Sequence, residues 1–407
     1  MLYMYKPQSF GARLCFTSSP RRARSSAAIV EGAGGSRMRG LTRAAKRAGE
    51  MAFNAGGGAV NWFPGHMAAA SRAIRDRLKL ADLVIEVRDA RIPLSSANED
   101  LQPVLAAKRR ILALNKKDLA NPNIMNRWLN HFESCKQDCI SINAHSSSSV
   151  NQLLGLAELK LKEAISKEPT LLIMVVGVPN VGKSALINSI HRIATSRFPV
   201  PDKNKRAMVG PLPGVTQDIA GYKIASQPSI YVLDTPGVLV PSIPDMETGL
   251  KLALTGAVKD SVVGEERIAK YLLSLLNIRK TPLHWERLVH RRGEVHEETC
   301  SHNENDSRDS LRRRRCLNNS DALYVQDLVT EVQRTLCRTC LDYTGNTEEE
   351  SELESLIDMQ LTALRKVFRI PHKPFDETHG PTSKKLLTLF RSGKLGPFIL
   401  DDLPDEQ

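Results

Sequence analysis

The segment Gly177-Val-Pro-Asn-Val-Gly-Lys-Ser184 matches the phosphate-loop pattern at every fixed position, and this feature constrains the fold most. The apolar run Leu171–Val176 before it has the length of a buried strand, and Ser184–Ile193 after it has helical spacing. A strand, this loop and a helix in succession form one unit of a parallel sheet whose loop amides cradle phosphate. The sequence therefore predicts an α/β domain that binds a nucleotide.

Further apolar runs of strand length flank this unit. They are 82–90, 110–115, 138–143 and 229–234, and helical patterns at 126–132 and 150–165 separate them. Continuous apolar strands that alternate with helices are typical of a parallel sheet covered on both faces. We expect one such domain over 58–278, opened by a helix after Pro64-Gly65 that carries Ile74, Leu78 and Leu80 on its apolar face.

The phosphate loop brings specific chemistry. The Lys183 amine reaches the β- and γ-phosphates, and the Ser184 hydroxyl ligates Mg²⁺. Asp234, at the end of a strand, can hold Mg²⁺ through its water shell, and the Gly237 N–H can meet the γ-phosphate. Thr216 could complete the Mg²⁺ shell, or could belong to an ordinary turn. The expected phosphate-binding residues are Asn180, Val181, Gly182, Lys183, Ser184, Ala185, Thr216 and Gly237, and the metal-binding residues are Ser184, Thr216 and Asp234.

The tetrapeptide Asn115-Lys116-Lys117-Asp118 follows another apolar strand. The Asp118 carboxylate can accept hydrogen bonds from both the N1–H and the exocyclic amine of guanine, an interaction that adenine cannot offer. Asn143 and Ala144, after a further strand, could supply the amide that meets the guanine oxygen. Alone, the tetrapeptide could be a polar strand end; beside a phosphate loop it indicates GTP.

The guanine-reading tetrapeptide precedes the phosphate loop, whereas an ordinary guanine-nucleotide domain has the opposite order. All of these loops follow the carboxyl ends of strands, so they meet at one edge of the sheet in whatever order the chain visits them. We interpret the order as a circular permutation, which α/β domains tolerate because their termini commonly lie close together. The switch loops then lead directly into the helical C-terminal region.

The segments 62–67 (WFPGHM), 89–95 (DARIPLS), 177–184 and 232–239 (VLDTPGVL), in this order, resemble the circularly permuted GTPases of ribosome assembly, the family of bacterial ribosome biogenesis GTPase A and its mitochondrial counterpart. The resemblance is close over 61–277 and weak beyond. It implies a GTP-hydrolysing switch that contacts the large mitochondrial ribosomal subunit and its rRNA. It also implies Mg²⁺, K⁺ held with help from Asn180, and peripheral contact with the matrix side of the inner membrane. We expect a monomer.

Val238 occupies the place where many GTPases carry the glutamine that orients the attacking water. Because an apolar side chain cannot do this, His66 is the candidate catalytic residue: a histidine accepts a hydrogen bond from water near neutral pH, and the resemblance implies that this one reaches the γ-phosphate in the assembled complex. The alternative is that His66 caps a helix that begins near Met67.

The termini differ in composition from this domain. Residues 1–57 are rich in Arg and Ser and poor in acids, which predicts a mitochondrial transit peptide and a disordered basic segment, or a basic tail alone. The net charge of +12 favours an anionic partner, nucleic acid or membrane, and seven scattered cysteines give no disulfide framework. We expect a polar linker or insertion at 279–320 and a helical RNA-contacting domain at 321–407. Within that domain, 386–403 suggests a last helix, and one helical face carries Leu353, Leu356, Ile357, Leu361 and Leu364.

Two other functions remain open at this point. One is a non-catalytic GTP-binding scaffold on RNA or a membrane, and the other is a small-molecule or nucleotide kinase built on a phosphate loop. The presence of Lys183, Ser184, Thr216 and Asp234 favours hydrolysis over the scaffold. The guanine signature, which a kinase would not need, disfavours the kinase.

Overall fold

A computed structural model of the chain describes residues 47–51, 63–197, 220–226, 229–241, 243, 245–280, 285, 288, 310–371 and 379–404. All of these residues belong to one compact unit within Leu41–Gln407. Thr216 and almost all of the expected transit segment lie outside the described residues. Within the described residues, no helix combines the length and the apolar character needed to cross a membrane.

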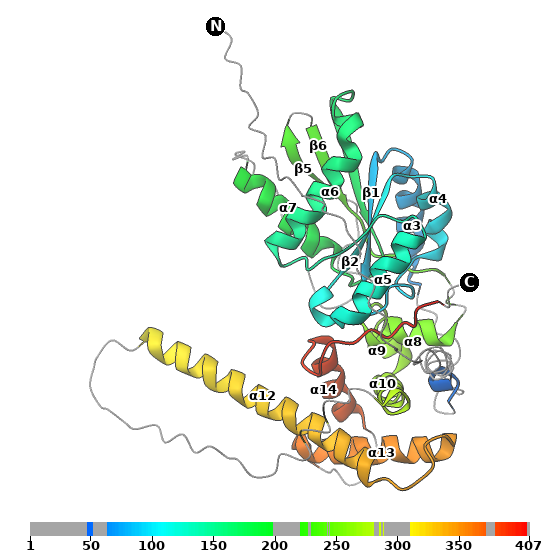
Figure 1. The fold of residues 1–407 in the computed structure, drawn as a ribbon, viewed down its shortest axis with the longest axis vertical. Coiled ribbons are helices and arrows are strands. Elements are labelled where there is room, and N and C mark those ends of the chain that lie inside the picture. The colour runs from blue at the N-terminus through cyan, green and yellow to red at the C-terminus, as the bar shows by residue number, and fades with distance from the viewer. Residues whose placement is uncertain are drawn as a thin grey trace, which may run out of the picture. The chain divides into compact units, whose positions relative to one another are not determined.

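The sheet has six strands in the order β3-β2-β1-β4-β6-β5 (Figure 1). The strands are β1 (Leu83–Asp89), β2 (Arg110–Asn115), β3 (Cys139–Ser141), β4 (Thr170–Val176), β5 (Ala220–Ser226) and β6 (Ser229–Asp234). The five strands predicted from apolar runs are confirmed, and all of them pair in parallel. The sixth strand, β5, pairs antiparallel with β6 at the edge of the sheet and was not predicted.

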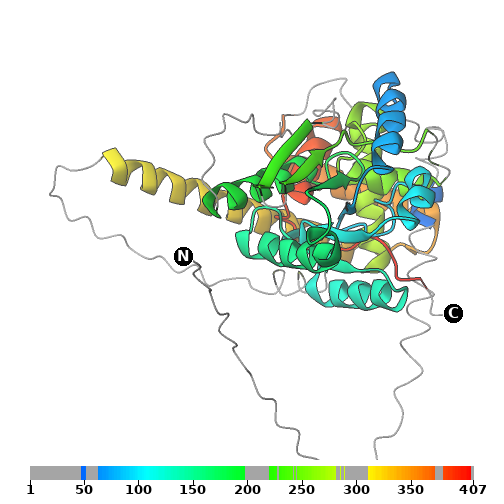
Figure 2. The same ribbon diagram turned by 90° about the horizontal axis from the view of Figure 1, so that it is seen from above.

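Helices cover both faces of the sheet, as expected (Figures 1 and 2). They are α3 (Gly65–Leu78), α4 (Gln102–Ala106), α5 (Pro122–Ser134), α6 (Ser147–Ile165) and α7 (Lys183–Arg197). Alternate residues of β1 serve the two faces: Ile85 belongs to the cluster that includes α6 and α7, whereas Val84 belongs to the cluster that includes α3 and α4. Apolar residues occupy both faces of these strands because both faces are buried.

The prediction that Leu80 belongs to the apolar face of α3 is wrong. Ile74 and Leu78 are fully buried, but Leu80 is 71% exposed. The helix ends at Leu78, and Leu80 lies in the turn that leads into β1, so the helical period no longer sets the direction of its side chain.

A layer of helices follows the sheet in the chain. It contains α8 (Met246–Leu254), α9 (Asp260–Val263), α10 (Glu265–Arg279), α12 (Ser310–Asp342), α13 (Glu350–Val367) and α14 (Gly380–Arg391). The predicted apolar face of α13 is fully buried, which confirms that helix. Figure 1 shows α10 beside α13 and α14, and Arg391 of α14 hydrogen-bonds to α8 and α9. Helices expected within 58–278 therefore pack with the C-terminal helices. Helix α12 begins at Ser310, inside the segment expected as a linker, where arginine and leucine favour a helix.

The C-terminal tail, residues 395–404, is not part of a helix. Gly393 and Gly396 have positive φ angles of 74° and 128°, and Pro397 follows them. These residues end α14 and turn the chain back toward the sheet. The expected helix within 386–403 therefore stops at Arg391, and the remainder forms turns and irregular structure.

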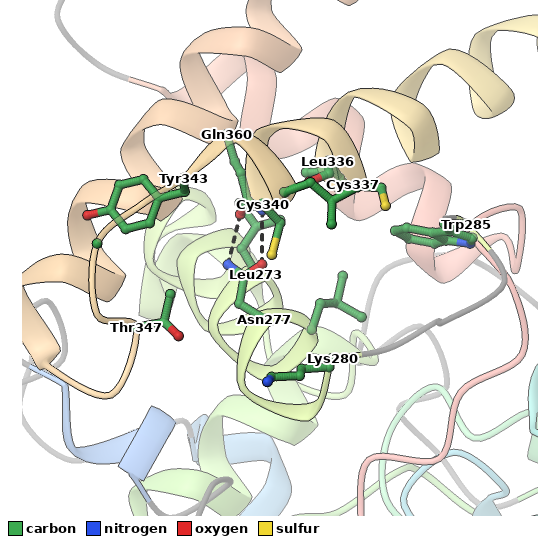
Figure 3. A pocket seen from close by; sticks show the side chains of 13 residues that line it. Leu273, Asn277, Lys280, Trp285, Leu336, Cys337, Cys340, Tyr343, Thr347 and Gln360 are labelled. Atoms are coloured by element: carbon green, nitrogen blue, oxygen red, sulfur yellow. Dashed lines mark hydrogen bonds between the residues drawn. The ribbon is translucent and has the colours of Figure 1, made fainter. Parts of the chain in front are cut away.

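A cavity of about 330 Å³ lies within the helical layer, between α10, α12 and α13 (Figure 3). The side chains of Asn277 and Gln360 exchange two hydrogen bonds of 2.9 Å at its wall. Leu273 and Leu336 supply apolar surface. Its lining includes no residue of the phosphate loop, so this cavity is separate from the expected nucleotide site.

Candidate nucleotide-binding site

The phosphate loop connects β4 to α7, as the sequence predicts. Asn180 and Gly182 have positive φ angles of 58° and 95°, which turns successive amides toward one side of the loop and creates an anion-binding concavity. Gly182 also has no room for a side chain, because a Cβ there would lie 2.3 Å from Nδ2 of Asn115. The Asn180 side chain donates to the Gly256 carbonyl at 2.8 Å, which links the loop to the helical layer. Ala185, in the first turn of α7, is partly buried.

Lys183 is buried at the end of this loop, with 5% of its surface exposed. Its Nζ donates to the Val178 carbonyl at 2.9 Å. Burial lowers the pKa of this amine to about 8, although nearby Asp234 acts in the opposite direction. A buried ammonium with one neutral acceptor is poorly compensated, and a phosphate would supply the missing negative charge.

Ser184 and Asp234 meet beside the loop, where the Ser184 hydroxyl donates to Asp234 Oδ2 at 2.8 Å. Asp234 is 1% exposed, and its Oδ1 has no hydrogen-bond partner within the described part of the chain. Burial raises the pKa of this carboxyl group. A buried carboxylate oxygen without a donor, next to a hydroxyl, is a set of hard oxygen ligands that suits Mg²⁺. The residues present therefore fit the predicted ion. The third expected ligand, Thr216, lies outside the described residues.

The loop after β6 packs directly on the phosphate loop. A Cβ at Gly237 would lie 2.6 Å from the backbone nitrogen of Pro179, so only glycine fits there. Val238 is 1% exposed, and its carbonyl accepts a hydrogen bond of 2.8 Å from Asn98. A buried valine cannot orient a water molecule, which agrees with the reasoning that led to His66.

The guanine-reading segment is tied to both neighbouring loops by one buried side chain. Asn115 Nδ2 donates to the Val181 carbonyl at 2.8 Å, and Asn115 Oδ1 accepts from the Ala144 amide at 2.9 Å. Lys117 and Asp118 are exposed, and Asn143 is partly buried. The structure thus brings together segments that lie far apart in the chain. The motifs meet at one edge of the sheet, which explains how the permuted order is accommodated.

His66 lies on the first turn of α3 and is exposed. The residue at the helix N-cap is Pro64, and no side chain caps the helix there, so the alternative role of His66 as a helix cap is wrong. Because α3 leads through a short turn into β1, its first turn lies toward the carboxyl edge of the strands, where the phosphate loop lies. Ala70 of α3 shares an apolar cluster with Val238, which supports this placement.

Sequence reasoning missed two charged residues of this site. Asp89 and Arg91, directly after β1, are each 2% exposed and form an ion pair of 2.8 Å. Asp89 also accepts from the Lys116 ammonium at 2.9 Å. The available signal was a pair of opposite charges at the end of an apolar strand, a position where burial is unusual for charged groups.

Comparisons with known proteins agree with this site. A family model described as 50S ribosome-binding GTPase matches residues 172–297. Short integuments 2, mitochondrial, of Arabidopsis thaliana is 66% identical over 361 residues, which cover 88% of this chain and 93% of that protein. Ribosome biogenesis GTPase A of Bacillus pumilus is 38% identical over 224 residues, 53% of this chain and 75% of that protein. Mitochondrial ribosome-associated GTPase 1 of Bos taurus is 40% identical over 224 residues, 54% of this chain and 66% of that protein.

The similarity to the first of these relatives extends over nearly the whole of both chains. The matched family model includes the phosphate loop and the loop after β6. The chain therefore belongs to the family of ribosome biogenesis GTPase A and mitochondrial ribosome-associated GTPase 1, and it is a GTPase.

Proposed function

We propose that this GTPase acts in mitochondria, where it binds the large ribosomal subunit and serves its assembly or mitochondrial translation. The observation that carries the proposal is the hydrogen bond from Asn115 to Val181, which joins the guanine-reading segment to the phosphate loop. The names of the relatives, which refer to ribosome biogenesis and to mitochondria, support the proposed partner and compartment. The net charge of +12 suits an rRNA partner. We further propose the matrix as its location, with peripheral contact with the inner membrane, and a monomeric state.

In this proposal each loop has one role at the nucleotide. Asp118 accepts hydrogen bonds from guanine, and the Asn143–Ala144 segment faces the guanine oxygen. The phosphate-loop amides and the Lys183 ammonium hold the phosphates, and Gly237 presents its amide to the γ-phosphate. Ser184 and Asp234, together with Thr216, hold Mg²⁺. When bound, Mg²⁺ neutralises negative charge on the phosphate oxygens during transfer.

The proposed mechanism assigns the attacking water to His66. Its imidazole would accept a hydrogen bond from that water, because Val238 is apolar and buried. His66 is exposed on the first turn of α3, so a bound partner could contact its side chain and orient the imidazole toward the γ-phosphate. Hydrolysis by the isolated chain should therefore be slow, and the ribosomal subunit should accelerate it.

Single-turnover GTP hydrolysis by the full chain, with and without purified large mitochondrial ribosomal subunits, tests this mechanism. We expect His66→Ala to bind GTP normally and to lose the acceleration, whereas His131→Ala, on α5, should keep it. An unchanged rate in His66→Ala would refute the role of His66. The same assay in potassium and in sodium tests whether Asn180 helps to hold K⁺, since only potassium should then support the full rate.

A further inference from the structure

Asp89 and Arg91 form a buried ion pair that the proposed mechanism does not use. Arg91 Nε and Nη2 donate to the two carboxylate oxygens of Asp89 at 2.9 and 2.8 Å. Such a bidentate pair fixes geometry well. Replacing a buried ion pair with apolar residues is often neutral or stabilising, so stability alone is a weak reason for its presence. Both residues also contact neighbouring segments of the site.

The Asp89 carboxylate holds the guanine-reading segment. It accepts a hydrogen bond of 2.9 Å from the ammonium of Lys116, and the neighbouring Ala90 amide donates to the Asn115 carbonyl at 2.8 Å. Lys116 has a left-handed backbone with φ of 64°, a conformation that costs a non-glycine residue free energy unless its surroundings impose it. The contact with Asp89 is one such constraint, two residues before Asp118.

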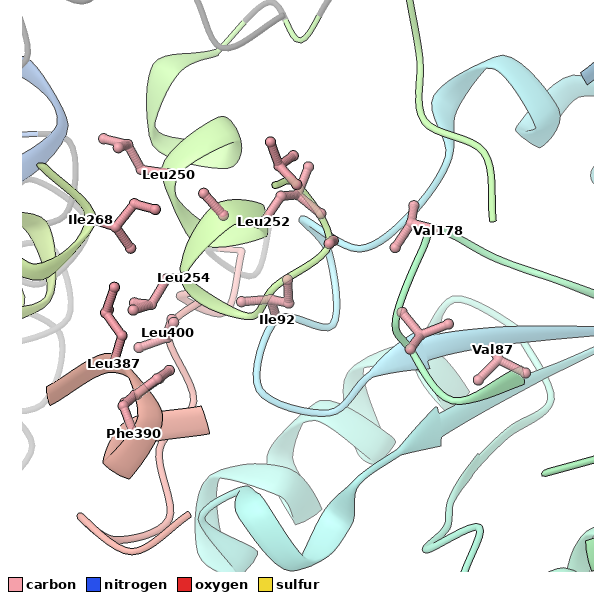
Figure 4. Packing of buried hydrophobic residues seen from close by; sticks show 14 of the residues in the cluster. Val87, Ile92, Val178, Leu250, Leu252, Leu254, Ile268, Leu387, Phe390 and Leu400 are labelled. Atoms are coloured by element: carbon pink, nitrogen blue, oxygen red, sulfur yellow. The ribbon is translucent and has the colours of Figure 1, made fainter. Parts of the chain in front are cut away.

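Arg91 in turn connects this segment to the C-terminal tail. Its guanidinium lies 5.7 Å from the centre of the Phe390 ring on α14, and its backbone carbonyl accepts from the Leu400 amide of the tail at 2.8 Å. The Phe398 amide donates to the Leu119 carbonyl at 3.0 Å, directly after the guanine-reading segment. Figure 4 shows Phe390 and Leu400 gathered near Ile92.

Asp401 anchors the tail in this position. Its carboxylate accepts from the amides of Leu94 and Ser95 at 2.8 and 2.9 Å and from the Ser95 hydroxyl at 2.6 Å. The buried ammonium of Lys251, on α8, lies 3.1 Å away. The tail is therefore held to the loop after β1 and to the helical layer by the same carboxylate.

We propose that Asp89 and Arg91 are positioning residues for guanine recognition, and that the C-terminal tail, docked on Arg91, sets the rate of guanine nucleotide release. The inference rests on the proposed guanine site at Asp118. Undocking of the tail removes the hydrogen bonds to the carbonyls of Arg91 and Leu119. Leu119 directly follows the guanine-reading segment, and Arg91 holds Asp89, which binds Lys116 of that segment. A partner that pulls on the helical layer would thereby speed nucleotide release without touching the nucleotide.

The chain offers a matched control for Arg91. Arg88 is 4% exposed, pairs with Glu86 two residues away at 2.7 Å, and lies 5.8 Å from the Phe132 ring. Its environment thus resembles that of Arg91, but the contacts described for it do not include Lys116 or the tail. Arg91 donates twice to Asp89, whereas Arg88 donates once to Glu86 and once, through Nη1, to the Pro93 carbonyl at 3.0 Å. Arg91→Lys and Arg88→Lys each keep the charge and remove two buried guanidinium hydrogen bonds, so their effects on general stability should be similar.

The test measures release of ribose-labelled fluorescent GDP and IDP from the full chain by stopped flow, together with thermal unfolding. IDP lacks the exocyclic amine that Asp118 would read. We expect Arg91→Lys to speed GDP release roughly five- to tenfold and to narrow the difference between GDP and IDP. Asp401→Asn should act in the same direction, and Arg88→Lys should leave both rates within about twofold of the original chain, the small effect expected of an uncoupled site.

Equal release rates for Arg91→Lys, Arg88→Lys and the unaltered chain would overturn this inference. So would faster release in both arginine variants with no change in the difference between GDP and IDP, since that pattern reports general loosening. Asp118→Ala separates the two levels of the proposal. If it discriminates GDP from IDP as well as the unaltered chain does, the assignment of the guanine site itself is wrong, and the positioning role falls with it.

Discussion

The buried ammonium of Lys183 makes nucleotide affinity depend on pH in a defined direction. Burial lowers the pKa of this group from the ordinary 10.5 to about 8, so the folded chain without nucleotide holds its proton less tightly than the unfolded chain. Between pH 8 and 10.5 the unfolded state binds more protons, and stability therefore rises with pH across this window. The difference corresponds to about 3 kcal/mol of unfavourable burial of the charged form below pH 8.

Phosphates reverse this preference, because their negative charge favours the protonated amine. Affinity for GDP should be full below pH 8 and should be lost as the pH rises through that value. With a pKa of about 8 in the free chain and a higher one in the complex, affinity should fall about tenfold between pH 7 and pH 9. At pH 8, binding should take up about half a proton per nucleotide.

Calorimetric titration with GDP measures both quantities when it is repeated in buffers of different ionisation enthalpy. Lys183→Arg is the control, since an arginine stays charged throughout this range. Any pH dependence that persists in this variant comes from other groups, including the base. Zero proton uptake at pH 8, or the same pH profile in both proteins, would refute the assignment of Lys183 as the buried phosphate ligand.

Three substitutions test the bridge between the site loops, the close packing at Gly237 and the buried face of α13. Asn115→Ala removes two buried hydrogen bonds of 2.8 and 2.9 Å, at about 1 kcal/mol each, so GDP should bind roughly 10- to 30-fold more weakly in a calorimetric titration; unchanged affinity would contradict the bridging role. Gly237→Ala should lower both GDP affinity and single-turnover hydrolysis, because the added Cβ overlaps Pro179 of the phosphate loop; normal affinity and a normal rate would show that the two loops need not pack this closely. Leu361→Ala should lower the free energy of unfolding in urea by about 2–5 kcal/mol, whereas Met359→Ala, at a half-exposed site on the same helix, should change it by under about 0.5 kcal/mol.

The parallel strands and the site loops could be predicted because their signals are local. Every residue of β1 is buried, and its apolar residues Leu83, Val84, Ile85 and Val87 mark the strand in the sequence despite the charged residues among them. The phosphate loop and the guanine-reading segment each carry their chemistry within a few residues, directly after such strands. Parallel pairing then brings the ends of β1 and β2 level, with Asp89 opposite Asn115, and the shared edge follows from the fold.

The parts that could not be predicted depend on contacts between distant segments. Strand β5 contains Gly221 and polar residues and forms at an edge, where only β6 supports it. The ion pair between Asp89 and Lys116 arises from the register of two strands. The position of the tail after α14 depends on contacts of Asp401 with Lys251 and the loop after β1, and nothing within the tail itself indicates these partners. In each case a tertiary contact, rather than local propensity, determines the structure.

If this GTPase is a switch on the large mitochondrial ribosomal subunit, as proposed, its attachment to the subunit should depend on the bound nucleotide. The most direct measurement is co-sedimentation of the full chain with purified large subunits, with a non-hydrolysable GTP analogue, with GDP and without nucleotide. We expect the chain to sediment with the subunit in the presence of the analogue and to be released with GDP. Equal sedimentation in all three conditions, or none in any of them, would contradict the proposed switch.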